Sequence, residues 1–266
     1  IKFEGNYCQN LMKLKFILPA VLLALSVFFY SCESNDSPVT YNLVSGSTNK
    51  VLVELFTNTS CIPCVAANQY LDDLTNSNVI IIRWHTTLYP NDPFYAYNSV
   101  DNGARQTYYN AANANPKGFL LGTYMGNYNA NLWTNNLNAQ LSASRSMGVS
   151  IVKSYDTTAR TGTLNISINQ NSGSSVSDLV YYVALTEDGL EYNAPNGETV
   201  FEQVMRDLFT SPNGDAINIA AGQTVNLAPL NFTIPSDIND KHASIIVFTQ
   251  STSSKTIYGV EKVSLR

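Results

Sequence analysis

Histidine, cysteine and charged residues are scarce in this chain, and each shortage argues against a class of function. The 266 residues include 2 His and 4 Cys, and the four charged types make up 13%, about half the usual share. A net charge of −5 without a basic stripe argues against a nucleic-acid partner. Structural zinc needs four ligands, so two histidines and one close cysteine pair predict no metal site. No phosphate loop or nucleophile elbow is present, and we expect no cofactor.

The N-terminal residues carry export signals rather than a folded domain. Residues 1–11, which include Cys8, precede the first methionine, and we expect the mature protein to lack them. Residues 12–31 combine two lysines with a mostly apolar run of 15 residues, Phe16 to Tyr30, which is short for a ~30 Å hydrocarbon core. This pattern predicts a signal peptide, with a transmembrane anchor as the alternative.

A cysteine follows the apolar run directly. Cys32 comes after the small residue Ser31, which resembles the lipobox of bacterial lipoproteins, although Phe29 and Tyr30 depart from the usual residues there. Residues 32–48 are polar and rich in Ser, Thr and Asn, as tethers are. We therefore expect lipidation at Cys32 and a place at the outer membrane, facing the periplasm or the cell surface. An ordinary secretory signal with a chance cysteine is the alternative.

The remaining chain changes its hydrophobic periodicity once, near residue 147. Residues 49–147 alternate buried strands with amphipathic helices, which predicts an α/β domain. Residues 148–266 form short segments of alternating apolar and polar residues between turns, which predicts an all-β antiparallel sandwich of the Ig-like kind. The segment from Thr86 to Asn98 is expected to be a long loop.

The segment TNTSCIPCVAAN, residues 57–68, holds the two cysteines left for the folded part, Cys61 and Cys64. Pro63 is tolerated only in a first helical turn, so a helix is expected to start at Cys61 or Ile62. Cysteines three positions apart on a helical turn share a face and can form a disulfide. The helix N-terminus lowers a thiol pKa, so Cys61 would attack a substrate disulfide and Cys64 would resolve the mixed disulfide.

The order strand, CxxC at a helix start, helix, strand, helix, X-Pro, hairpin and helix resembles the thioredoxin fold over residues 49–147. Thioredoxins hold a buried acid on the strand before the cysteines. The resemblance therefore implies that Glu54 takes the proton of Cys64. An acid at a strand end that faces water is the alternative.

Thioredoxins also carry a cis-proline opposite the CxxC motif, and the preceding backbone pairs with substrate like an added strand. The resemblance implies this role for Pro116, which lies 52 residues after Cys64 in the segment ANPKG. Asn115 would then bind substrate, together with the exposed dipeptide Ile62 and Pro63. An ordinary trans turn proline is the alternative.

A closer resemblance covers most of the mature chain. The segments VLVELFTNTSCIPC, HTTLYPNDPFY and ARQTYYNAANANPKGFLLG are similar to exported lipoproteins related to a twenty-eight-kilodalton outer-membrane protein. Members of that family pair a thioredoxin-like domain with a β-sandwich. The resemblance brings in five residues without an assigned role: His85, Asp92, Pro93, Arg105 and Tyr109. His85 is expected either to line the rim of the site or to be a satisfied structural histidine.

Two functions from different classes remain. The first is a lipid-anchored thiol–disulfide oxidoreductase whose partners are protein thiols and disulfides. The second is a binding or structural lipoprotein whose thioredoxin-like domain keeps a non-catalytic disulfide. The two differ in whether Cys61 and Cys64 exchange with other proteins. Neither assigns an oligomeric state.

Overall fold

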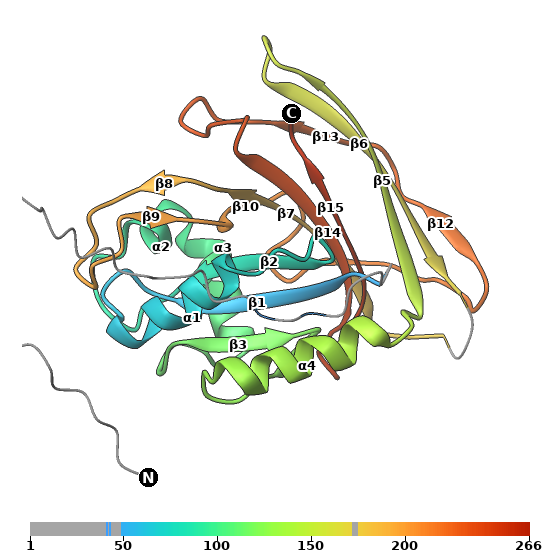
Figure 1. The fold of residues 1–266 in the computed structure, drawn as a ribbon. Coiled ribbons are helices and arrows are strands. Elements are labelled where there is room, and N and C mark those ends of the chain that lie inside the picture. The colour runs from blue at the N-terminus through green and yellow to red at the C-terminus, as the bar shows by residue number, and fades with distance from the viewer. Residues whose placement is uncertain (1–40, 42, 44–48, 172–174) are drawn as a thin grey trace, which may run out of the picture. The chain divides into compact units, whose positions relative to one another are not determined.

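The computed structural model describes residues 41, 43, 49–171 and 175–266. The predicted signal peptide, Cys8, the lipidation site Cys32 and most of the tether lie outside the described residues. The first half of the fold (Figure 1) contains, in chain order, β1 (Val51–Thr57), α1 (Ile62–Asp72), β2 (Val79–His85), α2 (Pro93–Tyr97), α3 (Ser99–Tyr108), β3 (Lys117–Leu120), β4 (Thr123–Tyr124) and α4 (Ala130–Ser142).

The second half consists of strands. In chain order they are β5 (Met147–Asp156), β6 (Thr161–Gln170), β7 (Leu179–Glu187), β8 (Leu190–Glu191), β9 (Val200–Phe201), β10 (Val204–Leu208), β11 (Asp215–Ala216), β12 (Thr224–Asn226), β13 (Leu230–Thr233), β14 (Ala243–Ser251) and β15 (Ile257–Ser264). The described chain is therefore mixed α/β and is mostly sheet.

One large sheet runs through both halves. Its strand order is β15–β14–β7–β10–β2–β1–β3–β4, and β11 pairs with β7 to complete nine strands. β1 and β2 run parallel, and β3 runs antiparallel to β1. β10 joins the halves, because it pairs with β2 through Val204 and Arg83 and with β7 on its other side. The predicted domain boundary near residue 147 falls between α4 and β5, and it stays a prediction.

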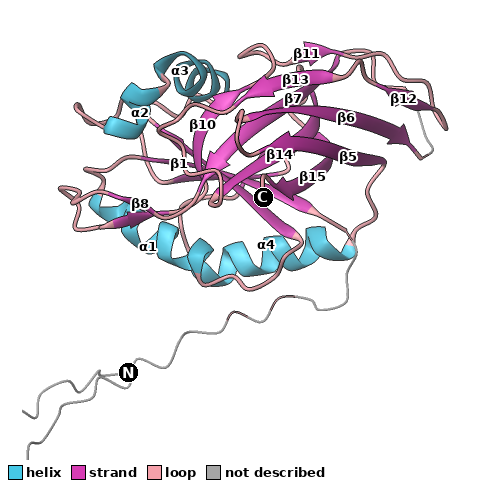
Figure 2. Ribbon diagram, turned by 90° about the horizontal axis from the view of Figure 1, so that it is seen from above, coloured by secondary structure: helices cyan, strands magenta, loops and turns pink. Residues whose placement is uncertain are grey.

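Helices cover both faces of the first-half strands. Figure 2 shows α1 and α4 along one side of the sheet and α2 and α3 on the other side. Every residue of β1 and β2 is buried. Strands covered on both faces need apolar side chains on both faces, which explains why most residues of these two segments are apolar.

A second sheet, in the order β12–β6–β13 with β5 paired to β6, lies against the second-half part of the large sheet. Exposure alternates along β5, as the period of two predicts. Ile166 and Ile168 of β6 share one buried cluster with Leu185 of β7 and Val247 of β14. The side chains between the two sheets therefore form the core of this half.

Local sequence signals agree with the structure at one helix start and one hairpin turn. The helix α1 begins at Ile62 with Cys61 as its N-cap, as predicted. The predicted hairpin turn contains Gly122 with a φ of +84°. A Cβ there would lie 1.8 Å from the carbonyl oxygen of Lys255, so only glycine fits.

The predicted long loop at residues 86–98 is wrong in part, because it contains the short helix α2. Asp92 caps this helix by accepting hydrogen bonds from the backbone N–H groups of Phe94 and Tyr95. Pro93 occupies the first turn, where its fixed φ is favourable. Five helical residues are too few to show a hydrophobic period in the sequence.

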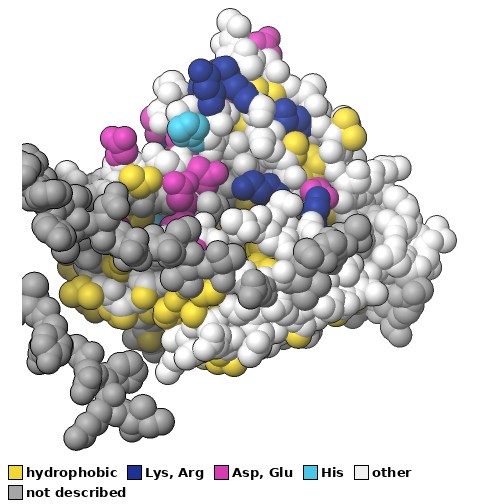
Figure 3. Space-filling view, viewed as in Figure 1, with side chains coloured by type: hydrophobic (Ala, Val, Ile, Leu, Met, Phe, Trp, Pro, Cys, Tyr) yellow, Lys and Arg dark blue, Asp and Glu magenta, His cyan; other side chains and the backbone are white. Residues whose placement is uncertain are grey.

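The surface carries few charges. On the face shown in Figure 3, Lys and Arg side chains form small separate groups, and uncharged groups occupy most of the remaining described surface. Among the residues that the structure describes, no helix is both long enough and apolar enough to cross a membrane.

Candidate functional site

Cys61 and Cys64 form a disulfide at the N-terminus of α1, with their Cα atoms 5.3 Å apart. Cys61 donates its backbone N–H to Asn58, and its own carbonyl oxygen accepts the N–H of Cys64. Cys61 is the N-cap of α1 and Cys64 lies in its first turn, so a separation of three positions brings the two side chains together. The predicted pairing of these two cysteines is thus present.

The dipeptide between the cysteines faces outward, whereas the cysteines themselves are covered. Ile62 is 73% exposed and Pro63 is also exposed. Cys61 and Cys64 are both 0% exposed. Ile62 and Pro63 therefore form the exposed surface beside the disulfide, and the two cysteines are covered.

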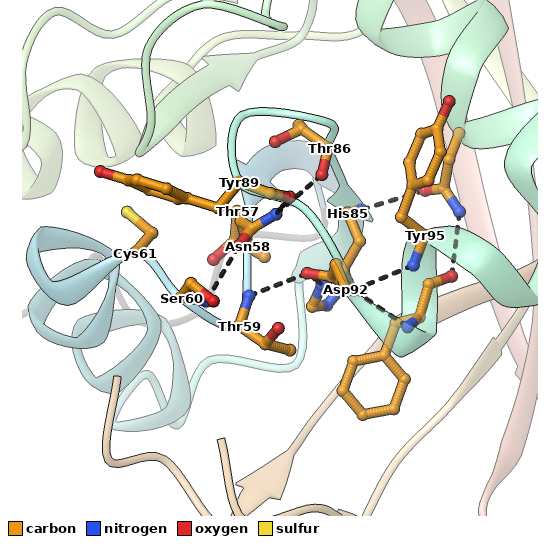
Figure 4. A network of polar contacts seen from close by, with 12 residues as sticks. Thr57, Asn58, Thr59, Ser60, Cys61, His85, Thr86, Tyr89, Asp92 and Tyr95 are labelled. Carbon is orange, nitrogen blue, oxygen red and sulfur yellow. Dashed lines mark hydrogen bonds and ion pairs between the residues drawn. The ribbon is translucent and has the colours of Figure 1, made fainter. Parts of the chain in front are cut away.

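The loop before the cysteines is held from one side by Asn58 (Figure 4). The Asn58 side-chain amide donates to the carbonyl oxygens of Thr86, at 2.8 Å, and Tyr89, at 3.1 Å. Its side-chain oxygen accepts the N–H of Ser60 at 2.9 Å. Asn58 is fully buried. Through these three hydrogen bonds it links the loop before the cysteines, residues 58–60 (the CxxC loop), to the segment after β2.

Asp92 holds the same loop from a second side. Its Oδ2 accepts the N–H of Thr59 at 2.8 Å and lies 2.8 Å from Nδ1 of His85, while its Oδ1 caps α2. Burial raises the pKa of Asp92, but the hydrogen bonds from His85, Thr59 and Tyr95 outweigh it and hold that pKa below its usual value. Asp92 therefore remains charged and joins three segments of the chain.

His85 lies inside this network rather than at a rim. It is 1% exposed, and its ring packs against Phe94 and Phe201 with centroid distances of 4.8 and 6.0 Å. Nε2 has no hydrogen-bond partner among the described residues. The geometry favours the structural alternative for His85, because one nitrogen binds Asp92 and the ring fills an aromatic cluster.

Glu54 is fully buried, and its carboxylate is bound by two residues from the α3 region. Arg105 donates from Nε to Oε1 at 2.7 Å and from Nη2 to Oε2 at 2.8 Å. The hydroxyl of Tyr109 donates to Oε2 at 2.8 Å and accepts from Gln250 of β14 at 2.9 Å. Arg105 and Tyr109, which the sequence left without a role, thus form a buried polar cluster with Glu54.

The structure does not bring Glu54 to the face of the sheet that carries the cysteine helix. Glu54 and Thr57 lie three positions apart on β1, so their side chains point to opposite faces. Thr57 accepts a hydrogen bond from Asn68 of α1 at 3.3 Å, whereas Glu54 binds Arg105 of α3. Proton transfer between Glu54 and Cys64 stays a prediction, and this geometry gives Glu54 another set of partners.

The peptide bond between Asn115 and Pro116 is cis, as predicted. The Asn115 side chain hydrogen-bonds the hydroxyl of Thr86 and, through its NH₂ group, the carbonyl oxygens of Ala111 and Ala114. The carbonyl of Thr86 in turn binds Asn58 in the loop before the cysteines. Thr86 therefore links the proline loop to the CxxC loop, and the substrate-binding role of Asn115 stays a prediction.

Two polar residues of the second half reach the CxxC loop without any signal in the sequence. Asn196 and Glu198 lie between β8 and β9, and they contact Thr59, Cys61 and Asn68. An Asn-Gly turn is visible in the segment APNGE, but a turn signal does not say what the turn touches. Among the described residues, no group of three or more His, Cys, Asp and Glu side chains is placed to hold a metal ion.

Comparison with known proteins shows that the fold of this chain is similar to that of a solved structure. No known family profile matches the chain, and no curated protein matches it. Among solved structures, HBP35 of Porphyromonas gingivalis superposes with a TM-score of 0.68 at 14% identity, over 81% of this chain and 75% of that chain. A domain of the outer membrane lipoprotein Omp28 from the same organism matches 45% of this chain and 88% of its own, at 13% identity and a TM-score of 0.32. The first likeness shows the fold alone, and the second is too weak to carry an argument.

Proposed function

We propose that this chain is a thiol–disulfide oxidoreductase of the cell envelope, attached to the outer membrane by a lipid at Cys32. In this proposal residues 49–147 are a thioredoxin-like domain and residues 148–266 an Ig-like sandwich. The observation that carries it is the Cys61–Cys64 disulfide at a helix N-terminus, in a loop joined through Thr86 to a cis-proline loop. The strand order β2–β1–β3–β4, with helices on both faces, supports it.

The reaction exchanges one disulfide for another. The Cys61 thiolate attacks one sulfur of a client disulfide, so that a bond forms between Cys61 and the client while the second client sulfur leaves as a thiolate. The Cys64 thiolate then attacks the Cys61 sulfur, which restores the Cys61–Cys64 disulfide and releases the first client thiolate. The client gains two electrons and, from solvent, two protons, and this protein becomes oxidised. The reverse sequence oxidises a client dithiol.

Client binding is assigned to the residues around the pair. Ile62 and Pro63 are exposed beside the covered sulfurs, and the backbone at Asn115 precedes the cis peptide bond of Pro116. An extended client segment would pair with that backbone while its disulfide approaches Cys61.

The second candidate is a structural or binding lipoprotein whose disulfide does not turn over. The observation that favours it is the complete burial of both cysteines, since reactive cysteines are usually partly exposed. The two candidates differ in one measurable property, which is whether Cys61 forms a mixed disulfide with another protein.

The variant Cys64→Ser is expected to accumulate mixed disulfides with client proteins in cells, because the resolving thiol is missing. These adducts are measured by non-reducing electrophoresis and mass spectrometry, and the Cys61→Ser/Cys64→Ser double variant is the matched control. Cys61 is also expected to titrate below about 8.5, the value of a free thiol. An absence of adducts, together with no reduction of insulin by the wild-type protein, would establish the second candidate instead.

The lipid anchor has a separate test. We expect the mature protein to begin at Cys32 with an acylated N-terminus, which mass spectrometry of the protein purified from membranes detects. An unmodified N-terminus on either side of Cys32 would exclude the anchor without affecting the redox proposal.

A further inference from the structure

The hairpin of β8 and β9 carries a loop from the second half onto the CxxC motif. Leu190 pairs with Phe201, and Glu191 pairs with Val200, at the base of this hairpin. At its far end the backbone N–H of Asn196 donates to the carbonyl oxygen of Thr59 at 3.1 Å. The loop is therefore docked by backbone contact directly before the cysteines.

The side chain of Asn196 connects the disulfide segment with a carboxylate. Its Nδ2 lies 3.4 Å from the carbonyl oxygen of Cys61 and 2.6 Å from Oε2 of Glu198. Its Oδ1 accepts the backbone N–H of Glu198 at 3.0 Å, which fixes the orientation of the amide. A single amide thus bridges the Cys61 backbone and the Glu198 carboxylate.

The other carboxylate oxygen of Glu198 is held by the cysteine helix itself. Asn68 donates from Nδ2 to Oε1 of Glu198 at 2.7 Å. Asn68 follows Cys64 by four positions on α1, so the two side chains lie on the same helical face. Glu198 is half-buried, and both of these partners are neutral amides. Its charge is therefore held beside the face of α1 that carries Cys64, and within the described part of the chain no cationic side chain forms an ion pair with it.

We propose that Glu198 is a positioning residue for the Cys61–Cys64 pair. The negative charge of its carboxylate shifts the dithiol–disulfide equilibrium of the pair toward the disulfide. The proposal rests on the proposed redox function, and it names the group that tunes this site. A nearby negative charge disfavours a thiolate and so opposes the effect of the helix N-terminus. Glu54 does not supply this charge, because Arg105 binds it on the opposite face of the sheet.

The equilibrium concerned is the exchange with glutathione. Two glutathione molecules reduce the Cys61–Cys64 bond, two electrons and two protons pass to the protein, and one glutathione disulfide forms. This equilibrium is measured on the purified protein without any client. It therefore separates a failure of the Glu198 proposal from a failure of the oxidoreductase proposal, which rests on client adducts.

The test is Glu198→Gln, which keeps the size of the side chain and removes its charge. We expect the glutathione equilibrium to move about three- to tenfold toward the dithiol, and the pH profile of Cys61 alkylation to move to lower pH. The matched control is Glu191→Gln, an exposed position on β8 of the same hairpin, which is expected to leave both quantities unchanged.

Two results would overturn the proposal. The first is a Glu198→Gln protein with the wild-type equilibrium and alkylation profile, and the second is an equal shift in Glu191→Gln. If circular dichroism shows that Glu198→Gln does not fold, Asn196→Ala carries the test, because it removes the amide between Cys61 and Glu198. A smaller shift in the same direction supports the proposal, and no shift contradicts it.

Discussion

Arg105→Met is expected to lower the free energy of unfolding by about 3–5 kcal/mol, because it leaves the buried charge of Glu54 without its cation. Both side chains are essentially inaccessible, at 1% and 0% exposure. Burial lowers the pKa of Arg105, but the adjacent Glu54 charge raises it more, so the guanidinium stays charged. After the substitution, the hydroxyl of Tyr109 still donates to Glu54, but it brings no positive charge.

The position of Arg105 adds a second loss. Its guanidinium carbon lies 4.6–5.7 Å from the centroids of five aromatic rings, which belong to Trp84, Tyr108, Tyr109, Tyr182 and Phe248. Tyr182 and Phe248 come from β7 and β14, so the cation contacts both halves of the fold. The Arg105→Met protein is therefore expected to unfold at a lower urea concentration, and both halves of the large sheet are expected to unfold together.

Urea unfolding followed by circular dichroism measures this loss, with Lys241→Met as a control that removes an exposed positive charge. The double variant Glu54→Leu/Arg105→Met is expected to recover most of the stability, because neither charge is then buried alone. A loss below about 1 kcal/mol for Arg105→Met would contradict the assignment, since that is the value of an exposed ion pair.

Asp92→Ala is expected to lower the free energy of unfolding by a similar amount, about 3–5 kcal/mol, and to loosen the CxxC loop. The substitution removes the N-cap of α2, the partner of His85 and the acceptor for the N–H of Thr59 together. Because Thr59 lies two positions before Cys61, we expect dithiothreitol to reduce the disulfide faster in this variant.

The pH dependence of the free energy of unfolding tests whether the charge of the Asp92 carboxylate stabilises the fold. The pKa of Asp92 is lower in the folded protein than in the unfolded chain, so its stabilising contribution is present above the unfolded value of about 3.9. It is lost as the pH falls below that value and through the folded pKa. As the pH falls from about 5 to about 2, the free energy of unfolding of the wild-type protein should therefore decrease more than that of Asp92→Ala.

Asp156→Ala is the matched control, since Asp156 also accepts two backbone N–H groups but is exposed, and no histidine among the described residues is bonded to it. We expect this control to keep the wild-type reduction rate and nearly the wild-type unfolding midpoint. Equal reduction rates for Asp92→Ala and the wild-type protein would show that Asp92 does not hold the CxxC loop.

Short-range physical rules made several features predictable from the sequence alone. Pro63 restricts its own backbone, so the helix start at Ile62 follows from residues within one turn. The mostly apolar composition of β1 and β2 indicates strands buried on both faces, and the alternation along β5 indicates a strand with one buried face. The pairing of Cys61 with Cys64 also depends only on a separation of three positions.

Tertiary structure decided the partners of the polar residues. Glu54 binds Arg105, 51 positions later, and Asn68 binds Glu198, 130 positions later. A hydrophobic period reports which face of an element is buried but not which distant side chain meets it. β10 and the β8–β9 hairpin escape prediction for a related reason, because strands of two to five residues show too little alternation.

The sequence by itself therefore determined that this protein carries a cysteine pair at a helix start, between two buried strands. Only the tertiary structure decided what surrounds the pair. It bound the loop before the cysteines to Asp92 and, through Asn58, to Thr86. It also paired Glu54 with Arg105 on the opposite face of the sheet and brought Glu198 to the cysteine helix. The physical reason is that charge and hydrogen bonding act through space, whereas the sequence reveals neighbours only along the chain.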